Sequence, residues 1–400
     1  MTRPFASVVN LGCRVNRVES DRITSDLAAA GFALVDPDEA DVIVINTCAV
    51  TGEAEAKTRK AVRHALAGPR EPIVVVTGCV VNLHPGELTD LSPRVIAEPS
   101  KIDVARTAAR AAGVAEAAPA VAGEHHDLSD LLGRSRLGIK VQDGCNNRCS
   151  YCIVWKARGP ERSVPVDVVL EQVRETDIPQ VRLSSLEPMD VHERLIDAMV
   201  AGGERVAPFL HLPLQSGCTA TLERMNRPYT AEEYEQVVAM IRSKLPAASI
   251  SCDIIAGFPG ETDEEFAQSL ALCERVGFSR MHVFRYSARP GTPAAESPHQ
   301  VSPEVMAERA SMLRAAGERC AQADAASRVG TCENAVLEYG NRGTLGSFHR
   351  VIVDDAPLDR AGTLVRVAID SMDERGNLHA HVVEGVAASA SAVPAGEGAL

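Results

Sequence analysis

Residues 145–152 read Cys-Asn-Asn-Arg-Cys-Ser-Tyr-Cys, which places the thiols of Cys145, Cys149 and Cys152 directly after a predicted strand at residues 136–141. Three thiols are fewer than the usual four protein ligands of a structural zinc site or an ordinary [4Fe–4S] centre, so a cluster held here keeps one iron free for a substrate or cofactor. The alternative is buried or disulfide-bonded cysteines. One short loop cannot pair three thiols, and eleven cysteines in a reducing compartment favour metal ligation.

Each of three apolar runs near the start of the chain leads to a cysteine: residues 6–12 to Cys13, residues 41–47 to Cys48, and residues 72–78 to Cys79. Helices predicted at about residues 14–30 and 53–66 alternate with these runs. The pattern predicts a parallel sheet covered on both faces, whose carboxyl strand ends line one crevice. Cysteine is also a small buried hydrophobic residue that packs at strand ends. Three in register nevertheless favour a second three-cysteine iron–sulfur site.

Strands and helices alternate again after the cysteine loop. Strands are predicted at residues 181–187, 208–216, 248–257 and 280–287, with helices at 167–175, 232–245 and 263–276. Such βα units predict an α/β partial barrel with its chemistry at the carboxyl ends of the strands. From Arg134 to Arg162 the chain carries seven Lys or Arg against two Asp or Glu. This local positive charge could bind phosphate groups.

The composition divides the chain into three folded parts, at residues 1–112, 136–326 and 327–385. Residues 113–135, rich in Ala, Gly, Pro and acid, are predicted to be a linker, and its adjacent His125 and His126 receive no role. A helix is predicted at 303–326. Short strands around residues 335–339, 347–353, 364–370 and 378–384 then predict a small β-barrel, and residues 386–400 have too little bulk to pack and are predicted to be a disordered tail.

Length, charge and hydropathy bound the function. Four hundred residues predict about two or three domains. No run approaches the ~18 apolar residues of a membrane helix, and the start does not resemble a signal peptide, so we expect a cytoplasmic protein without a membrane partner. The net charge of −13 argues against non-specific nucleic-acid binding, and 4% aromatic residues argue against broad base-stacking platforms.

Together these motifs resemble the radical SAM methylthiotransferases, which use S-adenosylmethionine (SAM) and have a cluster domain, a radical SAM barrel and a carboxyl-terminal TRAM domain. The resemblance runs from Leu11 to about Glu384. The segments Leu-Gly-Cys-Arg-Val-Asn-Arg-Val-Glu-Ser (11–20) and Asn-Thr-Cys-Ala-Val-Thr (46–51) resemble the subgroup acting on N6-threonylcarbamoyladenosine at position 37 of tRNA. Further matching segments are residues 158–159, 162–163, 211–217, 225–227, 257–261 and 282–287.

The resemblance implies that Cys145, Cys149 and Cys152 hold a [4Fe–4S] cluster whose open iron chelates SAM. One electron then cleaves SAM to a 5′-deoxyadenosyl radical, which can take the hydrogen at C2 of adenine that no side-chain base can remove. A second [4Fe–4S] cluster, which delivers the sulfur, is implied at Cys13, Cys48 and Cys79. The implied partners are the tRNA, an electron donor and a sulfur source. Candidate SAM-binding residues are Tyr151, Gln215, Ser216, Gly257 and Glu261.

The chain also departs from the family pattern. Helix 167–175 runs almost directly into the strand at 181–187, where the family has a further βα unit of roughly 30 residues. The expected barrel is therefore one βα unit short, with five strands. Trp155 and Lys156 stand where the family usually has Pro and an aromatic residue. Residues 333–384 carry a net charge of −4, whereas a tRNA-binding barrel is expected to carry basic patches.

The leading prediction is methylthiolation of C2 of N6-threonylcarbamoyladenosine in tRNA. One alternative is methylthiolation of a ribosomal protein side chain, against which the residues around Cys48 argue. The other alternative is a catalytically inactive, cluster-bearing protein that binds tRNA, because a barrel unit is missing.

Overall fold

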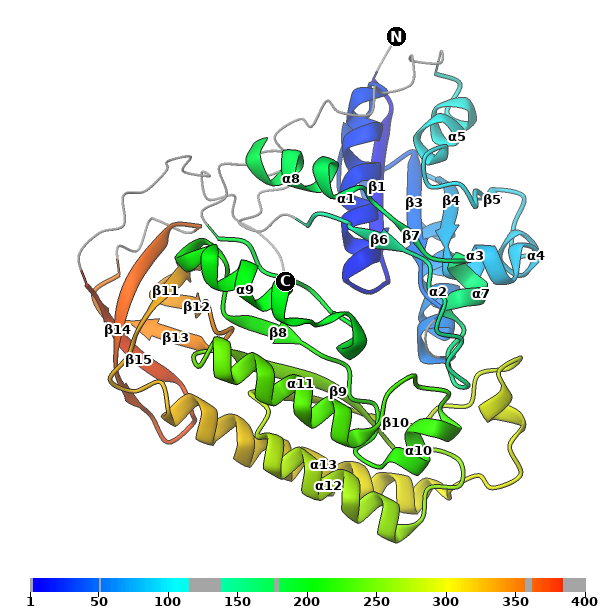
Figure 1. Ribbon diagram of the computed structural model, residues 1–400. Helices are drawn as coiled ribbons and strands as arrows, with labels where there is room; N and C mark the ends of the chain where they lie inside the picture. Colours follow the sequence, from blue (N-terminus) through cyan, green and yellow to red (C-terminus); the bar gives the residue numbers. More distant parts are fainter. Residues whose placement is uncertain (1–2, 50–51, 115–137, 176–179, 357–361, 384–400) are drawn as a thin grey trace.

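The computed structural model describes residues 3–49, 52–114, 138–175, 180–356 and 362–383. The predicted linker from residue 115 onward, His125 and His126 within it, and the predicted tail lie outside these described residues. Figure 1 shows a first sheet with its helices in blue and cyan, a second sheet with helices in green and yellow, and a small barrel in orange and red.

The first sheet is parallel throughout and has five strands in the order β2-β1-β3-β4-β5. The strands are β1 (Phe5–Asn10), β2 (Ala33–Leu34), β3 (Val42–Thr47), β4 (Ile73–Gly78) and β5 (Val95–Ala97). The helices around it are α1 (Arg14–Ala29), α2 (Gly52–Leu66), α3 (Cys79–Leu83), α4 (Pro85–Thr89) and α5 (Val104–Ala111), with a 3₁₀ turn η1 (Pro37–Glu39).

Alternate side chains of the first sheet pack under different helices. Val42 and Val44 pack with residues of α1 and α5, whereas Ile43 and Ile45 pack with residues of α2 and α3. Because successive strand residues point to opposite faces, continuous Val and Ile runs bury both faces at once. The predicted parallel sheet covered on both faces is therefore confirmed.

The second sheet is also parallel but has only three strands, in the order β10-β9-β8. These are β8 (Phe209–His211), β9 (Ser249–Ala256) and β10 (Arg280–Arg285). The helices of this region are α7 (Val154–Arg158), α8 (Val166–Glu175), α9 (Glu193–Ala201), α10 (Thr219–Arg224), α11 (Ala231–Lys244), α12 (Asp263–Val276) and α13 (Pro303–Ala326), with 3₁₀ turns at Pro188–Asp190, Gly203–Arg205 and Pro293–Glu296. Within the described residues, no helix is long and apolar enough to cross a membrane.

Two of the predicted barrel strands do not join this sheet. Residues 138–141 are not a strand, and the following β6 (Gln142–Asp143) pairs antiparallel with β7 (Arg162–Ser163). This segment instead lies against α1: a Cβ on Gly138 would lie 2.4 Å from Val18 Cγ2, and Lys140 Nζ lies 2.6 Å from Glu19 Oε1. The segment is thereby held against the first sheet's helix.

Residues 181–187 contribute only isolated parallel bridges, Val181 with Val206 and Ser185 with His211. The predicted strand at residues 208–216 is likewise reduced to β8. Pro208 and Pro213 flank β8, and proline cannot donate a hydrogen bond to a strand ladder. The expected five-stranded partial barrel is therefore a three-stranded sheet with a bridged edge.

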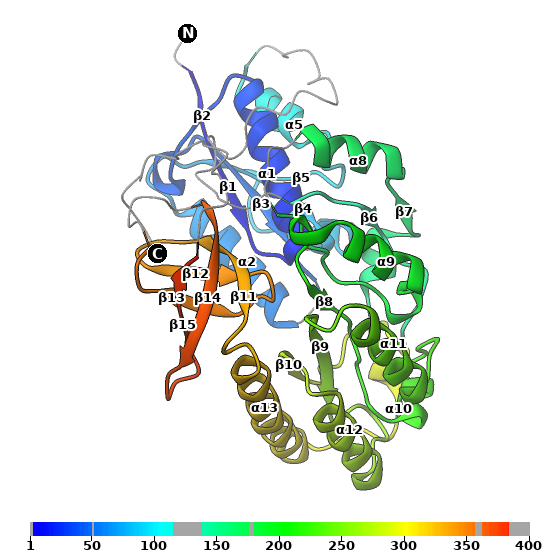
Figure 2. The same cartoon turned by 60° about the vertical axis from the view of Figure 1, so that its left-hand side comes forward.

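The last strands form a closed barrel in the order β11-β12-β13-β15-β14, seen on the left in Figure 2. They are β11 (Cys332–Leu337), β12 (Arg342–Leu345), β13 (Arg350–Val353), β14 (Leu364–Met372) and β15 (Leu378–Val382). Alternating residues such as Ala335, Leu337, Val351 and Val353 fill its interior together with Ala325 of α13. The predicted small β-barrel is confirmed, and β12 is the strand that the sequence analysis missed.

Candidate functional site

The cysteine loop at residues 145–152 is anchored to the segment that follows α10. Ser150 N donates to Met225 O at 2.9 Å, and Asn226 Nδ2 donates to the carbonyls of Asn147 and Arg148 at 3.2 and 3.1 Å. Arg148 adopts φ 49°, a left-handed conformation that turns the loop back on itself. The loop is thus fixed by groups more than seventy residues further along the chain.

Two nitrogen donors lie beside the thiols of this loop. The Val154 amide donates to Cys152 Sγ at 3.4 Å, and Arg227 Nη1 donates to Cys149 Sγ at 3.3 Å. Burial raises the pKa of Cys152 to about 11. N–H donors to sulfur stabilise the thiolates that bind iron, and binding a metal displaces the thiol protons. This donor set fits an iron–sulfur cluster.

Arg227 is in turn held by Glu187. Its guanidinium is 3% exposed and forms an ion pair with the Glu187 carboxylate, and its Nε donates to Tyr229 Oη at 3.1 Å. Residues 225–227 are one of the segments that resemble the family, and the sequence alone predicts no role for Arg227. No local pattern marks this pair, because its members are 40 residues apart.

Tyr151 joins an aromatic cluster beside the loop. Its ring lies edge-on to Phe258 with centroids 6.3 Å apart, and Phe258 lies 5.6 Å from Tyr286. Burial raises the pKa of Tyr151 well above its usual value, so the phenol is neutral. Phe258 follows Gly257, so the carboxyl end of β9 lies next to the cysteine loop. The SAM contact of Tyr151 stays a prediction.

The other predicted SAM-binding residues lie at the ends of β8 and β9. Gln215 adopts φ 66° and forms a bridge with Ile254. Ser216 is fully buried, with its Oγ 3.0 Å from Ser269 Oγ. Gly257 has φ 73°, and a Cβ there would lie 2.4 Å from Met306 Cγ. Glycine is therefore required at this turn.

Glu261 has partners within the protein. Its carboxylate accepts from the Gly257 amide at 2.9 Å and from Arg309 Nη1 at 2.8 Å, and it is 1% exposed. Burial raises its pKa despite the nearby Arg309. These two contacts stabilise the turn after β9. Contacts of Glu261, Gln215, Ser216 and Gly257 with SAM stay predictions.

Cys13, Cys48 and Cys79 lie at the carboxyl ends of the neighbouring strands β1, β3 and β4. Cys48 and Cys79 are 6% and 4% exposed, and Cys13 is exposed. Burial raises the pKa of Cys79, the Arg158 guanidinium opposes that rise, and the nearby Cys48 and Cys13 thiols add to it. The structure thus brings three thiols with sequence separations above thirty residues to one edge of the sheet. As a donor set they also fit an iron–sulfur cluster.

Arg158, in α7 just after the first cysteine loop, reaches this second group of cysteines. Its positive charge opposes the rise in the pKa of Cys79. The guanidinium donates to Asn16 Oδ1 at 2.5 Å, to Glu19 Oε1 at 2.9 Å and to Asp143 Oδ1 at 2.8 Å. Glu19 also accepts from Lys101 and Lys140. Buried charges need such partners. Arg158 therefore links the helix that follows the first cysteine loop to the residues around Cys79.

A second link between the two sheets is made by Arg289, which follows β10. Its Nη2 donates to Ala49 O at 2.6 Å and to Glu55 Oε1 at 2.5 Å. Ala49 is the residue after Cys48. Both cysteine sites are accordingly parts of one continuous structure.

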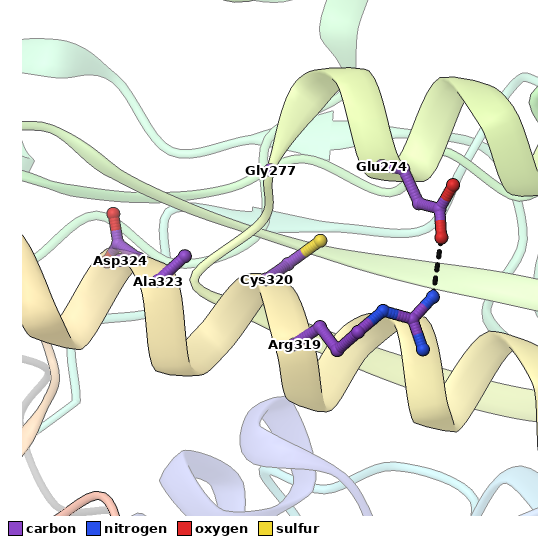
Figure 3. Close-up of a pocket in the computed structure, with 6 residues that line it drawn as sticks. All are labelled: Glu274, Gly277, Arg319, Cys320, Ala323 and Asp324. Atoms are coloured by element: carbon purple, nitrogen blue, oxygen red, sulfur yellow. Dashed lines mark hydrogen bonds and ion pairs between the residues drawn. The ribbon is translucent and has the colours of Figure 1, made fainter.

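Three further polar residues share the second sheet: His211, Asp253 and His282. A surface pocket of about 320 Å³ lies elsewhere, between α12 and α13, and its lining includes Cys320, Arg319 and Glu274 (Figure 3). Arg319 and Glu274 form an ion pair at 2.5 Å. None of the six predicted cluster cysteines lines that pocket.

The chain matches the models of two protein families. Residues 6–97 match the model described as "Uncharacterized protein family UPF0004", and residues 139–204 and 178–273 match the Radical SAM superfamily. Among solved structures, the radical S-adenosylmethionine methyltransferase TsrM of Kitasatospora setae has a TM-score of 0.51 and 15% identity, with 74% of this chain and 77% of that chain covered. That likeness is one of fold.

Several curated relatives match most of the chain. The threonylcarbamoyladenosine tRNA methylthiotransferase MtaB of Bacillus subtilis is 31% identical, with 82% of each chain covered. Its counterpart in Thermotoga maritima is 29% identical, covering 94% of this chain and 98% of that protein. The tRNA-2-methylthio-N(6)-dimethylallyladenosine synthase of Acidothermus cellulolyticus is 32% identical, covering 86% of this chain and 79% of that protein.

Proposed function

Because this chain belongs to the radical SAM methylthiotransferases, in the subgroup of the MtaB enzymes, we propose that it methylthiolates C2 of N6-threonylcarbamoyladenosine at position 37 of tRNA. It is an enzyme that uses SAM and [4Fe–4S] clusters. The proposed domains are a cluster domain at residues 1–112, a radical SAM domain at residues 136–326 and a TRAM-like β-barrel at residues 327–385.

The observation that carries the proposal is the connection of two three-cysteine sites through Arg158. We assign Cys145, Cys149 and Cys152 to the cluster that binds SAM, and Cys13, Cys48 and Cys79 to the cluster that supplies sulfur. When bound, these groups supply radical chemistry and the sulfur to be transferred. Two open clusters on one rigid scaffold are what sulfur insertion needs, since radical formation and sulfur delivery must meet at one substrate atom.

The protein's own side chains prepare these sites. Arg227 places a positive charge and an N–H donor at Cys149, and Glu187 holds that guanidinium in place. In the second group of cysteines, Arg158 places a positive charge near Cys79, and Glu19 and Asp143 are its carboxylate partners. Both arginines balance thiolate charge inside a largely buried region.

The choice of nucleoside rests on the segment at residues 46–51 and on the MtaB relatives. The Acidothermus relative gives a second candidate, dimethylallyladenosine in tRNA, with equal support from overall identity. The residues around Cys48 are what favour the first candidate.

The test uses a bacterial strain deleted for its own methylthiotransferases of both tRNA nucleosides. Expression of this chain is expected to restore the 2-methylthio derivative of threonylcarbamoyladenosine, measured by mass spectrometry of digested tRNA. Cys48→Ala and Cys149→Ala variants are expected to restore none. Appearance of the dimethylallyladenosine derivative instead would assign the second candidate.

A second measurement tests the alternative that the protein binds clusters and tRNA but is catalytically inactive. Anaerobically reconstituted protein is expected to bind about eight irons per chain and to release 5′-deoxyadenosine from SAM with dithionite. Full iron without any 5′-deoxyadenosine would identify a cluster-bearing protein that does not turn over. Methylthiolation of a ribosomal protein and not of tRNA would overturn the proposed substrate.

A further inference from the structure

A group of His211, Asp253 and His282 lies on the three strands of the second sheet, one residue from each strand. One ligand atom of each residue lies within 4.8 Å of the others, and no other group of three such residues meets that spacing in the described part of the chain. None of the three is among the predicted cluster ligands or SAM-binding residues.

The register of the sheet explains why their side chains meet. His282 pairs with Asp253, and His211 pairs with Ser251, two residues before Asp253. Paired residues of parallel strands point to the same face, as do residues two apart. Ile250, Cys252 and Ile254 pack into the core formed with the helices, so Ser251 and Asp253 face the opposite side. The three ligands therefore share the inner face of the sheet.

The distances and orientation suit a metal ion. His211 Nε2 lies 3.4 Å from Asp253 Oδ2, and the rings of His211 and His282 lie with centroids 5.9 Å apart. Ligands at about 2.0–2.2 Å from one ion lie roughly 3–3.5 Å from each other, so only a small closure is needed. The other nitrogen of His211, Nδ1, lies 2.9 Å from Ser251 Oγ, which fixes the ring with Nε2 toward the group. Metal-binding histidines are commonly held this way.

The charges around the group also favour a cation. The His211 side chain is 6% exposed and Asp253 31% exposed. Among the described residues, the ion-pair partner of Asp253 is His211. A partly buried carboxylate between two imidazoles is best balanced by a positive ion.

We propose that His211, Asp253 and His282 bind a divalent transition-metal ion, with Zn²⁺ as the best match. Two imidazole nitrogens and one carboxylate oxygen are the donors that Zn²⁺ accepts, whereas Ca²⁺ and Mg²⁺ prefer sites made of oxygen. Three protein ligands leave a position open on the inner face. Ile255, two residues after Asp253, packs against the cluster of Tyr151 and Phe258. The strand that carries Asp253 therefore also contributes, two residues later, to the apolar cluster on which Tyr151 of the first cysteine loop packs.

The experiment uses reconstituted protein, in which the cluster cysteines are already occupied by iron. The protein is equilibrated with buffered Zn²⁺, desalted, and analysed for zinc and iron by mass spectrometry. Wild-type protein is expected to retain about one zinc per chain. Asp253→Asn and His282→Gln are expected to lose the zinc with their iron unchanged, while His64→Gln, which changes an exposed histidine on α2, keeps it.

A second readout does not depend on any variant. Zinc-edge X-ray absorption of the wild-type protein is expected to show nitrogen and oxygen ligands only. Sulfur in the first shell would place the zinc at cysteines and overturn the proposal, as would absence of bound zinc or its retention in both variants. Ser251→Ala is expected to weaken zinc binding roughly 10-fold, because it removes the partner that orients His211.

Discussion

At the scale of single residues, the side chains that matter most beside the cysteines are arginines with distant carboxylate partners. Arg227 and Arg158 each reach a thiol while an acid holds the guanidinium. The carboxylate partners come from distant parts of the chain, so each arginine reaches its thiol only when the tertiary structure has formed.

Replacing Arg227 by Ala removes a cation and an N–H donor from Cys149. The reduction potential of the first cluster is expected to become more negative, because less positive charge stabilises the reduced state. SAM cleavage is expected to fall roughly 10- to 100-fold. Potentiometry followed by electron paramagnetic resonance measures the first effect, and Arg227→Lys should recover part of the potential. An unchanged potential in Arg227→Ala would contradict the assignment of Arg227 to this cluster.

Asp143 makes stability depend on pH. Burial opposes ionisation, but hydrogen bonds from Lys140 and Arg158 outweigh it and lower the pKa of Asp143 below its ordinary value of 3.8. The ionised form thus stabilises the fold above about pH 4, and this contribution is lost as pH falls below that value. Asp143→Asn is expected to cost about 1–3 kcal/mol at pH 7. Thermal unfolding of the apoprotein should show a smaller cost at pH 3, and an equal cost at both pH values would refute this reading.

At the scale of elements, the turn from β4 into α3 sets the position of Cys79. Gly78 has φ 100°, and a Cβ there would lie 2.5 Å from Thr47 O and 2.8 Å from Asn46 Oδ1. Both neighbours belong to β3, which leads to Cys48. The turn therefore has no room for a side chain.

Gly78→Ala is expected to displace Cys79 and to prevent assembly of the second cluster alone. Reconstituted protein should then hold about four irons in place of about eight, with release of 5′-deoxyadenosine retained. Iron analysis and product chromatography measure the two effects. Gly86→Ala is the matched control, because a Cβ at Gly86 meets nothing within 4 Å. Full iron content in Gly78→Ala would show that the turn tolerates the change.

The elements that sequence reasoning predicted correctly are those whose pattern is local. Strand β3 is a continuous run of buried residues, and α12 begins with the capping box of Thr262 and Glu265. Helix α13 likewise begins after Ser302 with Pro303, a strong start signal. Each of these signals is formed by residues that are close together in the sequence, so the sequence alone is enough to predict the element.

The elements that it predicted wrongly depend on distant contacts. The segment at residues 138–141 is not part of the second sheet and lies against α1, where Gly138 is next to Val18 and Lys140 pairs with Glu19. Both partners are some 120 residues earlier in the chain. The positions of Cys13, Cys48 and Cys79 at neighbouring strand ends could be predicted from sequence, and their role as cluster ligands stays a prediction. Arg227, Glu187 and the group around His211 could not be predicted, because their meaning lies in the register of strands and in ion pairs across the fold.

At the scale of the whole molecule, Arg158 links the helix after the first cysteine loop to the residues around Cys79. Arg158→Gln keeps a polar side chain but removes the charge shared by Asn16, Glu19 and Asp143. We expect roughly 10-fold less methylthiolated nucleoside per 5′-deoxyadenosine released, because the second cluster is misplaced relative to the first.

The ratio of the two products, measured on tRNA in single-turnover reactions, is the test of this prediction. Arg275→Gln, which removes an exposed arginine paired with Glu235 on the outer helices, is the matched control and should leave the ratio unchanged. A proportional loss of both products in Arg158→Gln would mean that Arg158 supports the fold in general and does not couple the sites.

The contact between Arg289 and Ala49 spans 240 residues of chain. During synthesis, the ribosome needs roughly 12–50 seconds to add that many residues at about 5–20 residues per second. Ala49, the residue after Cys48, is therefore synthesised well before Arg289 can contact it. The complete surroundings of this cysteine form only after β10 and the segment that follows it have been translated.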